Sequence, residues 1–553
     1  MSLQEFSSRT RKENIERIRD HTFDLIVIGG GITGAAIARD AVMRGFTVAL
    51  LEKGDFASGT SSRSSKLVHG GLRYLRHMKF SLVFGALRER WILRKNAPRL
   101  VKPLTFLIPV YKDAKTGKGM LSMGLWLYDI LAFFRTPKFH GWLNPDKALE
   151  LEPTLRHDQF VGAGLYADCA TDDARLTLAV VKDAWSRGAL LANYARIVGF
   201  EKEQGRIVGV KAQDLISGIQ FSARAKVVVN AAGPWSDKLR KLDDPSAEPR
   251  LRLAKGTHLI LAGGLIGKRE AVVLESRRDG RNLFVVPWGD LCLVGTTDTD
   301  YHGDLDHIAP SGEDVEYLLD SLHEYFPDNK VTRGDIVSSY AAVRPLAAEL
   351  GVTEDDVSRD ELIFESSSGL VSIIGGKLTT HRSMAKALVD QVSHKLAREF
   401  ATPEKRGCET DRFALDYDET ELEKAVNELI QNSGLDAEVA RHLVEAYGPG
   451  TTRVLEIIRE NPQFSSKILP EVPYLMAEAV YAARYEMAMK LIDFMFRRTQ
   501  LVYRVRDHGQ SVARNVGNLM GKELGWTAET TEKELRELEK ECEIAEPPGR
   551  LLI

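Results

Sequence analysis

Apolar and polar positions change their spacing along the chain, and this spacing predicts the elements of the fold. Residues 23–28 (FDLIVI) form a largely apolar run typical of a buried strand. A glycine turn, an alanine-rich amphipathic stretch and a second apolar run at 47–51 follow it, which predicts a strand, a helix and a strand. Residues 225–239 and 368–392 repeat a short β-branched run, glycine and a helical pattern, so we expect one sheet assembled from distant segments.

Two other patterns indicate further structural units. Residues 281–301 (RNLFVVPWGDLCLVGTTDTDY) read as a hairpin that turns at Gly289 and Asp290, which predicts an antiparallel sheet separate from the first. After about residue 400 the spacing becomes helical with many charges, and Gly434 and Gly448 stand where helices should end. We therefore expect a boundary at 401–411 and an all-α domain after it.

The composition excludes little. A chain of 553 residues has room for about three domains. Its 75 Lys and Arg against 78 Asp and Glu give a net charge of -3, so no bulk basic character points to nucleic acid. Residues 56–88, however, contain six Lys or Arg and no carboxylate. This run is either a solvated face or an anion-binding segment.

Three observations bear on the compartment. The four cysteines are far apart, without a C-x-x-C pair, which is typical of a reducing compartment. Residues 1–24 lack the apolar stretch of a secretory signal, so we expect the mature chain to begin near Met1. The apolar stretch 120–134 contains Asp129 and is shorter than the roughly 20 residues that span a bilayer, so we interpret it as a helix of a cap domain.

The glycine turn after the first predicted strand is the first candidate site. Gly29, Gly31 and Gly34 fit G-x-G-x-x-G, and Glu52 closes the second strand, where a carboxylate can bind an adenosine ribose. Gly29 would allow the tight turn, Gly31 the approach of a pyrophosphate, and Gly34 close packing of helix and strand. The motif fits FAD or NAD. We favour FAD, because no second such motif follows a strand and a serine-rich run comes soon after Glu52.

A resemblance to a known family rests on motifs that occur in one order along the chain. They are GDFASGTSSRSSKLVHGGLRYL (54–75), TDDARL (171–176), NAAGPWSD (230–237), KGTH (255–258), GTTDTDY (295–301), RPL (344–346) and GGKLTTHR (375–382). Together they resemble the FAD-dependent, aerobic and quinone-linked glycerol-3-phosphate dehydrogenase family from about residue 23 to 382, and the helical C-terminal region is similar too. The resemblance implies an α/β fold of the D-amino-acid-oxidase-like flavoprotein type.

That fold interleaves two regions along the chain. We expect Rossmann-like FAD-binding segments at about 20–80, 160–240 and 345–400, and antiparallel substrate (cap) segments at about 81–159 and 241–344. The all-α domain would occupy 401–553. The residues that we expect along FAD are Gly29, Gly30, Gly31, Thr33, Gly34, Glu52, Lys53, Ser61, Ser62, Ser64, Leu67, His69, Gly70, Gly71, Val198, Gly233, Gly376, Leu378 and Thr379.

Arginines are the candidates for binding a substrate phosphate, because a guanidinium presents a planar pair of donors and stays charged when water is excluded. Arg73 and Tyr74 follow the glycine pair at 70–71 and can face a substrate that lies against the flavin. The resemblance carries a substrate-binding arginine onto Arg344, which Pro345 restricts to extended geometry. Without the resemblance, each would be interpreted as a surface arginine.

Two further residues are candidates for the redox step. Lys377 follows two glycines at the start of an apparent helix, where a cation and a helix N-terminus would stabilise negative charge on a reduced flavin; alternatively, it caps its own loop. His258 is our candidate for the base that removes the hydroxyl proton, although a core histidine is the alternative. His69 competes for this role, but flavin contact suits it better. No cluster has metal-ligand spacing, and Asp298 and Asp300 suggest a turn rather than a cation site.

The sequence therefore predicts a flavoenzyme that oxidises sn-glycerol 3-phosphate to dihydroxyacetone phosphate. The resemblance implies a quinone acceptor and a cytoplasmic protein bound peripherally to the inner face of the cell membrane. A homodimer is left open. A basic segment near the N-terminus and the apolar stretch 121–134, flanked by Lys115, Lys118, Arg135 and Lys138, agree with such contact. The alternatives are an oxidase that uses oxygen, an oxidase of amino or hydroxy acids, and a non-catalytic flavin-binding scaffold or sensor.

Overall fold

The computed structural model describes residues 5–267, 269–347, 361–403 and 405–549. Within them, eight strands form a first sheet, in which β18, β10, β1, β2 and β7 run parallel. β17 pairs antiparallel with β18, and β8 and β9 extend β10 as an antiparallel meander. The strands are β1 (Thr22–Ile28), β2 (Val48–Leu51), β7 (Leu190–Ala192), β8 (Ala195–Glu203), β9 (Arg206–Asp214), β10 (Gln220–Asn230), β17 (Leu362–Glu365) and β18 (Leu370–Ile374).

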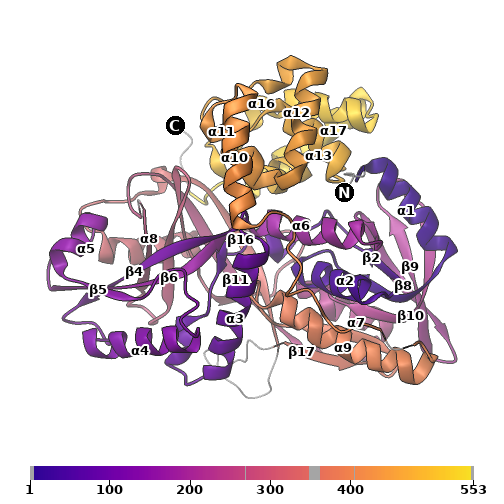
Figure 1. Ribbon diagram of the computed structural model, residues 1–553, viewed down its shortest axis with the longest axis horizontal. Helices are drawn as coiled ribbons and strands as arrows, with labels where there is room; N and C mark the ends of the chain where they lie inside the picture. The colour runs from indigo at the N-terminus through magenta and orange to yellow at the C-terminus, as the bar shows by residue number, and fades with distance from the viewer. Residues whose placement is uncertain (1–4, 268, 348–360, 404, 550–553) are drawn as a thin grey trace.

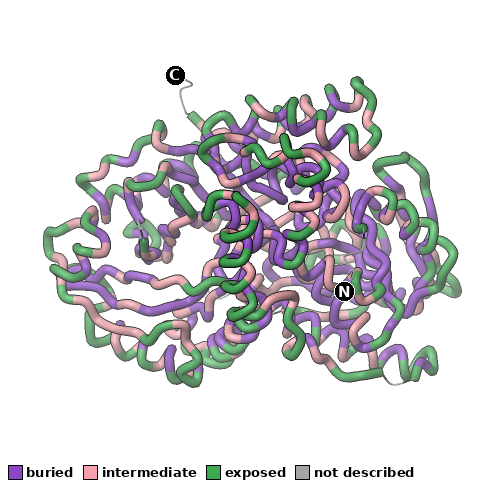
Figure 2. Tube along the Cα trace, turned by 45° about the horizontal axis from the view of Figure 1, so that its top comes forward, coloured by how far each residue is buried: buried purple, intermediate pink, exposed green. Residues whose placement is uncertain are grey.

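The parallel strands β1, β2, β7 and β18 are buried on both faces, because successive side chains of a strand point to opposite faces. Leu25 and Val27 of β1 join the apolar cluster that includes α2, α6 and α9, whereas Ile26 and Ile28 join a second cluster on the other face. Figure 2 shows that the buried stretches of the chain lie inside the molecule and the exposed ones at its outside. The helices around this sheet are α1 (Ser8–Asp20), α2 (Ile32–Arg44), α6 (Asp173–Ser186), α7 (Ser236–Asp243) and α9 (His381–Phe400).

Ten described strands form a second sheet, which is antiparallel except where β4 pairs with β12. Figure 1 shows it beside the first sheet, with α4 along its lower edge. The strands are β3 (Leu67–Val68), β4 (Val101–Tyr111), β5 (Gly141–Leu143), β6 (Phe160–Thr171), β11 (Leu251–Ala262), β12 (Ala271–Glu275), β13 (Asn282–Trp288), β14 (Leu291–Gly295), β15 (Thr299–Asp300) and β16 (Ile336–Ala347). The helices of this half are α3 (Phe80–Asn96), α4 (Lys118–Leu131), α5 (Pro145–Leu151) and α8 (Gly312–Tyr325).

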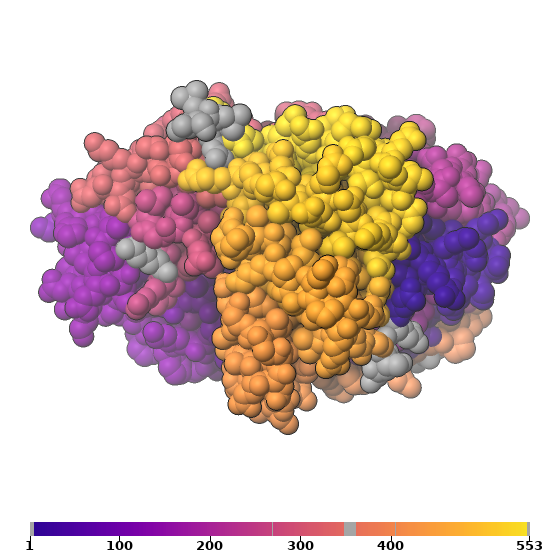
Figure 3. Space-filling model, turned by 90° about the horizontal axis from the view of Figure 1, so that it is seen from above, coloured from indigo at the N-terminus to yellow at the C-terminus, as the bar shows by residue number. Residues whose placement is uncertain are grey.

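The helical C-terminal region lies across the junction of the two halves (Figures 1 and 3). It shares a core with the second sheet: the ring centroids of Tyr503 and Tyr340 of β16 are 5.2 Å apart. Its elements are α10 (Glu419–Ser433), α11 (Ala437–Tyr447), α12 (Thr451–Glu460), α13 (Met476–Tyr485), α14 (Leu491–Asp493), the π-helix Phe494–Arg498, α15 (Leu501–Arg504), α16 (Gln510–Leu524) and α17 (Ala528–Ala545).

Several local predictions are confirmed. β1, α2 and β2 form the expected unit, and β13 and β14 form a hairpin that turns at Gly289. Gly434 and Gly448 end α10 and α11. Three stretches that we assigned to FAD-binding segments lie in the second sheet: β3, β6 and residues 345–347 of β16. The reason is that β6 pairs with β3 and β4, and the end of β16 pairs with β11.

Candidate active site

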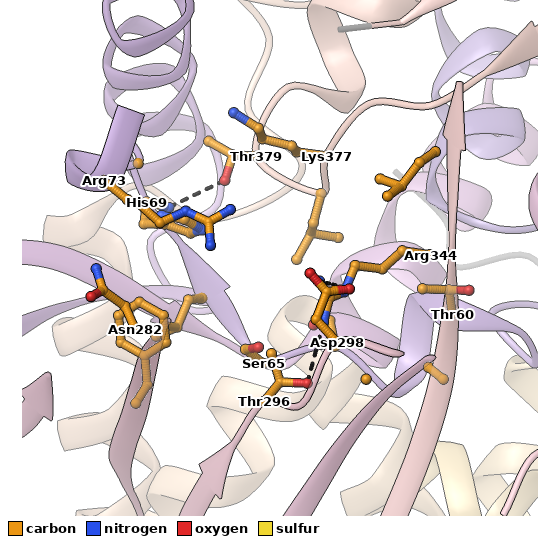
Figure 4. A pocket seen from close by; sticks show the side chains of 18 of the residues that line it. Thr60, Ser65, His69, Arg73, Asn282, Thr296, Asp298, Arg344, Lys377 and Thr379 are labelled. Carbon is orange, nitrogen blue, oxygen red and sulfur yellow. Dashed lines mark hydrogen bonds and ion pairs between the residues drawn. The ribbon is translucent and has the colours of Figure 1, made fainter. Parts of the chain in front are cut away.

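A cavity of about 1240 Å³ is lined by elements of both sheets. The turn before α2 and residues of β8 line it from the first sheet, and residues of β11, β13 and β16 line it from the second. The polar run 58–65 also contributes to its wall. Figure 4 shows part of this cavity, with side chains from distant parts of the chain pointing into it. The interleaved chain therefore builds one site from both halves.

The glycine turn at one part of the cavity is fixed by close packing. Gly29 has φ +113°, which side-chain-bearing residues rarely adopt, and a Cβ there would lie 2.5 Å from the Ala231 carbonyl oxygen. A Cβ at Gly34 would lie 1.9 Å from the Gly29 carbonyl oxygen, so helix and strand meet too closely for a side chain. Gly31 is the N-cap of α2 and provides no side-chain cap, so the helix presents main-chain N–H groups and its positive dipole end to the cavity.

Glu52 joins the end of β2 to this turn. Its Oε2 accepts a hydrogen bond from the Gly30 N–H at 2.6 Å, and its Oε1 accepts one from the Gly54 N–H at 2.7 Å. Burial raises the pKa of the Glu52 carboxyl, and the two N–H donors oppose that shift. Glu52 lines the cavity, so it is placed to accept hydrogen bonds from a ribose.

The hydrogen-bond donors along the wall of this cavity fit FAD. The α2 N-terminus suits a pyrophosphate, and the Ser61 hydroxyl lies beside it, accepting from the Ile32 N–H at 3.0 Å. Lys53 adds a cation, paired with Asp306. Of the residues that we expected along FAD, those that line the cavity are Gly29, Gly31, Thr33, Glu52, Lys53, Ser61, Ser64, Leu67, His69, Gly71, Gly233, Gly376, Leu378 and Thr379.

Four expected residues pack behind this wall instead. Gly30 packs against Glu52 and Phe56, and Gly34 against Gly29. Ser62 is buried in the 3₁₀ turn Thr60–Ser62. Gly70 donates its N–H to Asp168 at 3.3 Å, and a Cβ there would lie 2.4 Å from the Tyr128 hydroxyl. These residues support the segments that line the cavity, but they are not part of the cavity surface.

Val198 also lies outside the cavity lining, although we expected it at the cofactor. The pairing of β8 with β9 shifts between Ile197 and Gly199. Val198 lies at this irregularity, and its neighbours Ala195, Arg196 and Ile197 line the cavity instead. A local break in register is not visible in the apolar pattern of the sequence.

Arg73 and Tyr74, which we expected on the substrate side, lie together with Lys377, which we expected at the flavin. Gly71, with φ +75°, turns the chain into the 3₁₀ helix Leu72–Leu75, which carries Arg73 and Tyr74. The Arg73 guanidinium carbon lies 5.6 Å from the Tyr74 ring centroid, and the Lys377 Nζ lies 3.9 Å from it. All three line the cavity. The helix that we expected to start at Lys377 starts at His381, because Gly375 and Gly376 adopt positive φ and the chain turns once more before α9.

Arg344 projects from β16 into another part of the same cavity (Figure 4). Its Nη2 donates to the Thr297 carbonyl oxygen at 2.8 Å, and its Nη1 lies 3.3 Å from Asp298 Oδ1. Arg281 Nη1 lies 2.5 Å from Asp298 Oδ2. Asp298, which we interpreted as part of a turn, thus lies in the cavity and orients two guanidinium groups. Sequence reasoning missed Asp298 and Arg281; the signal available was the carboxylate inside the GTTDTDY motif.

His258 lies on β11 with its side chain almost fully buried, and it lines the cavity. Its Nε2 lies 2.9 Å from the Ser65 hydroxyl, a partner that the sequence did not indicate. Burial, followed by the nearby positive charges of Arg344 and Lys66, lowers the pKa of His258 to about 3. The imidazole is therefore neutral near pH 7. His69 contacts the same wall through its N–H, which donates to the Thr379 hydroxyl at 3.2 Å.

Comparison with known proteins identifies the family. A model of the FAD dependent oxidoreductase family matches residues 24–382, and one of the C-terminal domain of alpha-glycerophosphate oxidase matches 408–531. The aerobic glycerol-3-phosphate dehydrogenase of Staphylococcus saprophyticus is 36% identical over 541 residues, which cover 96% of each chain. The chain belongs to the FAD-dependent glycerol-3-phosphate dehydrogenase family. The resemblance seen in its motifs is confirmed.

Other relatives agree with this membership. The aerobic glycerol-3-phosphate dehydrogenase of Staphylococcus aureus USA300 is 37% identical to this family member over 91% of its chain and 90% of the relative. The FAD complex of the glycerol-3-phosphate dehydrogenase from Bacillus halodurans has a TM-score of 0.82 and 34% identity, and the match covers 99% and 100% of the two chains. The L-alpha-glycerophosphate oxidase of Mycoplasma pneumoniae, at 18% identity and a TM-score of 0.54, shares the fold over 67% of this chain and 95% of its own. FAD is the cofactor of this dehydrogenase family member.

Proposed function

We propose that this protein oxidises sn-glycerol 3-phosphate to dihydroxyacetone phosphate. The observation that carries the proposal is that Arg73, Arg344 and Lys377, from three distant segments, line the same cavity as the FAD-binding glycine turn and a buried, neutral His258. The names of the relatives agree with this substrate. Their agreement alone would leave open which residues recognise it.

The cations in the cavity suit a phosphomonoester dianion. Arg344 is held by Asp298 and the Thr297 carbonyl oxygen, so its planar donor pair has a fixed orientation. Arg73 and Lys377 add positive charge from another part of the wall. Their field would fix the phosphate and leave the C2 carbon at a defined place in the cavity.

Oxidation of the C2 alcohol needs a hydride acceptor and a proton acceptor. FAD, when bound, accepts the hydride that leaves C2. His258 takes the hydroxyl proton while the C2–O bond becomes a carbonyl, because its imidazole is neutral and lies in the cavity wall. Ser65, 2.9 Å from Nε2, orients the ring.

The proposed function is tested by anaerobic bleaching of the purified yellow protein. Glycerol 3-phosphate should bleach the flavin absorbance, and glycerol should not, because it lacks the phosphate. Recolouring with a quinone analogue but not with oxygen would support a quinone-dependent dehydrogenase, whereas rapid recolouring with oxygen would indicate an oxidase. The proposal would be contradicted if an amino or hydroxy acid bleached the flavin, or if no phosphorylated polyol did so.

The pH dependence of the reaction should show the low pKa of His258. We compare kcat/KM of the parent with that of His258→Gln, so that titration of the substrate phosphate cancels in the ratio. Since a base with a pKa of about 3 stays deprotonated, the ratio should stay within about twofold from pH 5 to pH 8. A base with the ordinary pKa near 6.5 would lower the ratio about 30-fold at pH 5. Steady-state assays at several pH values distinguish the two.

A quinone acceptor would approach from the apolar surface around α4. Large apolar side chains are exposed there, and positive charges flank them. Met78, Phe80, Met120 and Met123 belong both to this surface and to the cavity lining, so the cavity reaches the surface at this point. The exposed apolar residues are Met78, Phe80, Phe84, Met120, Met123, Trp126, Ile130, Phe133, Phe134 and Phe139, and the flanking cations are Lys115, Lys118, Arg135 and Lys138.

We also propose that the protein is cytoplasmic and binds peripherally to the inner face of the cell membrane. No described helix has both the length and the apolar character needed to cross a bilayer. Apolar side chains that enter the headgroup region, together with cations that attract anionic lipids, give such binding. The C-terminal helices lie on the opposite side of the molecule from α4 (Figure 1).

Introducing carboxylates into this surface should weaken membrane binding. Met123→Glu with Trp126→Glu should lower the affinity for anionic vesicles by about 10- to 100-fold, because both side chains are more than half exposed and would otherwise bury apolar area. Vesicle co-sedimentation measures this. Ile219→Glu, also on an exposed apolar residue, is the control and should bind as the parent does. If the paired variant bound as well as the control, the contact surface would lie elsewhere.

A further inference from the structure

The segment 493–500 of the C-terminal region contacts the loop after β2. The π-helix Phe494–Arg498 ends in two arginines that both reach Asp55. Arg497 Nε lies 2.6 Å from Asp55 Oδ2, and Arg498 contacts both carboxylate oxygens at 2.7 and 3.1 Å. The Asp55 side chain is 0% exposed. This contact joins the C-terminal region to the loop that begins at Glu52.

The loop around Asp55 is in turn bonded to the glycine turn of the FAD site. Gly54, the residue before Asp55, donates its N–H to Glu52. Ala57 donates its N–H to the Gly30 carbonyl oxygen at 3.1 Å. The ring of Phe56 lies against Gly30, 2.8 Å from where a Cβ would be. A displacement of Asp55 would therefore move Glu52 and the turn that receives the pyrophosphate.

The same C-terminal segment also holds the far end of the serine-rich run. Asp173 accepts hydrogen bonds from the Ser64 N–H at 2.9 Å and the Ser64 hydroxyl at 2.7 Å. Its neighbour Asp172 accepts one from Gln500 at 2.8 Å, and Arg175 Nε donates to the Arg498 carbonyl oxygen at 3.0 Å. Figure 1 shows α6, which carries these residues, beneath the C-terminal helices.

The charged groups at this contact are buried. Three carboxylates meet three guanidinium groups, and Lys182 Nζ lies 3.8 Å from Glu486 Oε1. Burial alone would raise the pKa of Asp55, but Arg498 and Arg497 outweigh it and hold that pKa below its ordinary value. Removing one partner would leave an uncompensated buried charge, which a protein relieves by moving the segment that carries it. The six residues are Asp55, Glu486, Asp493, Arg175, Arg497 and Arg498.

We propose that residues 493–500 are a functional part of the FAD site, with Arg497 and Arg498 as positioning residues that fix the segment 52–66 against the cofactor. The helical C-terminal region is then required for FAD affinity. This inference rests on the family's cofactor and not on the proposed substrate. The inference can be wrong although the protein oxidises glycerol 3-phosphate, and it can be right although the protein oxidises another substrate.

The test is titration of the full-length apoprotein with FAD. Arg498→Gln and Asp55→Asn should each raise the dissociation constant for FAD by at least about tenfold, measured by quenching of flavin fluorescence. Arg498→Lys keeps the charge but loses the planar donor pair, so its affinity should lie between those of the parent and Arg498→Gln. The lysine variant also serves if the glutamine variant does not fold.

Arg99→Gln is the matched control. Arg99 is a buried arginine that also joins the C-terminal region to the rest of the chain. It pairs with Asp416, and its Nη1 donates to the carbonyl oxygens of Glu445 at 2.8 Å and Ala446 at 2.9 Å. It does not line the cavity. Its variant should lower the Tm of the apoprotein as the Arg498 variant does, yet bind FAD within about twofold of the parent. Equal loss of FAD affinity in the two variants, or no loss in Arg498→Gln, would overturn the proposal.

A double-mutant cycle on FAD affinity provides a second test of the positioning role. If Asp55 and Arg498 act as one unit on the cofactor, the variant with both Asp55→Asn and Arg498→Gln should bind FAD no more weakly than either single variant, because no uncompensated charge remains between them. Losses that multiply in the double variant would show that the two side chains act independently and would contradict the positioning role.

Discussion

Arg344→Ala should lower kcat/KM for glycerol 3-phosphate by about 30- to 5,000-fold, because the bound phosphate would lose a charge partner in the cavity, at a cost of about 2–5 kcal/mol. Arg344→Lys should lose about 10- to 150-fold, since lysine keeps the charge but not the planar donor pair, at about 1.5–3 kcal/mol for a charge-assisted hydrogen bond. Steady-state kinetics with glycerol 3-phosphate and with glycerol measure both variants. Glycerol should be a poor substrate for all three proteins, because it has no phosphate.

Arg252→Ala is the matched control for Arg344. Arg252 lies on β11 and pairs with Asp300 at 2.8 Å, close to Asp298 in the sequence but outside the cavity lining. Its variant should keep kcat/KM within about threefold of the parent, because exposed ion pairs contribute little. All variants must retain FAD. If Arg344→Ala kept the parental kcat/KM, the phosphate would have to bind elsewhere, and Arg73 would be the next residue to test.

Gly31→Val should give a folded protein that binds FAD more weakly than the parent does. Gly31 has ordinary backbone angles, and its added Cβ meets only the Ser61 hydroxyl, at 3.0 Å, on the wall of the cavity. A branched side chain there would crowd the helix N-terminus that should receive the pyrophosphate. The overpacking cost of about 1–3 kcal/mol corresponds to about a 5- to 150-fold weaker FAD affinity. Visible absorbance and FAD titration of the apoprotein measure the loss.

Gly34→Val separates cofactor loss from folding loss. A Cβ at Gly34 would meet the Gly29 carbonyl oxygen at 1.9 Å, so this variant should lower the stability of the apoprotein itself. Gly31→Val should leave the circular dichroism and the Tm of the apoprotein close to those of the parent. A parental dissociation constant for FAD in folded Gly31→Val would falsify the assignment of this turn to the pyrophosphate.

Local patterns in the sequence predict where the helices and strands of this fold lie better than they predict which strands pair. The unit of β1, α2 and β2 is written in the spacing of apolar residues and glycines, and the β13–β14 hairpin in the residues at its turn. The placement of β6 in the second sheet depends on its pairing with β4, about 60 residues earlier. The break in register beside Val198 likewise depends on a neighbouring strand.

For the candidate site, too, the sequence predicts individual residues better than it predicts which residues contact one another. The motifs led to Arg73, His258, Arg344 and Lys377, and all four line one cavity. Partners brought together by the fold were missed. Ser65 and His258 are 193 residues apart, and the motif that contains Asp298 gives no sign that this carboxylate orients Arg344. Such contacts follow from the packing of distant strands, which a single sequence does not display.

The contact between Asp55 and Arg498 also sets an order of events during synthesis. The two residues are separated by 443 positions. At about 5–20 residues per second, a ribosome adds Arg498 about 20–90 s after Asp55. For all that time the nascent chain carries a glycine turn whose supporting loop has no guanidinium partners. We therefore expect the flavin to be captured after the chain has been released, or almost so, and nascent chains that end before the π-helix to remain colourless.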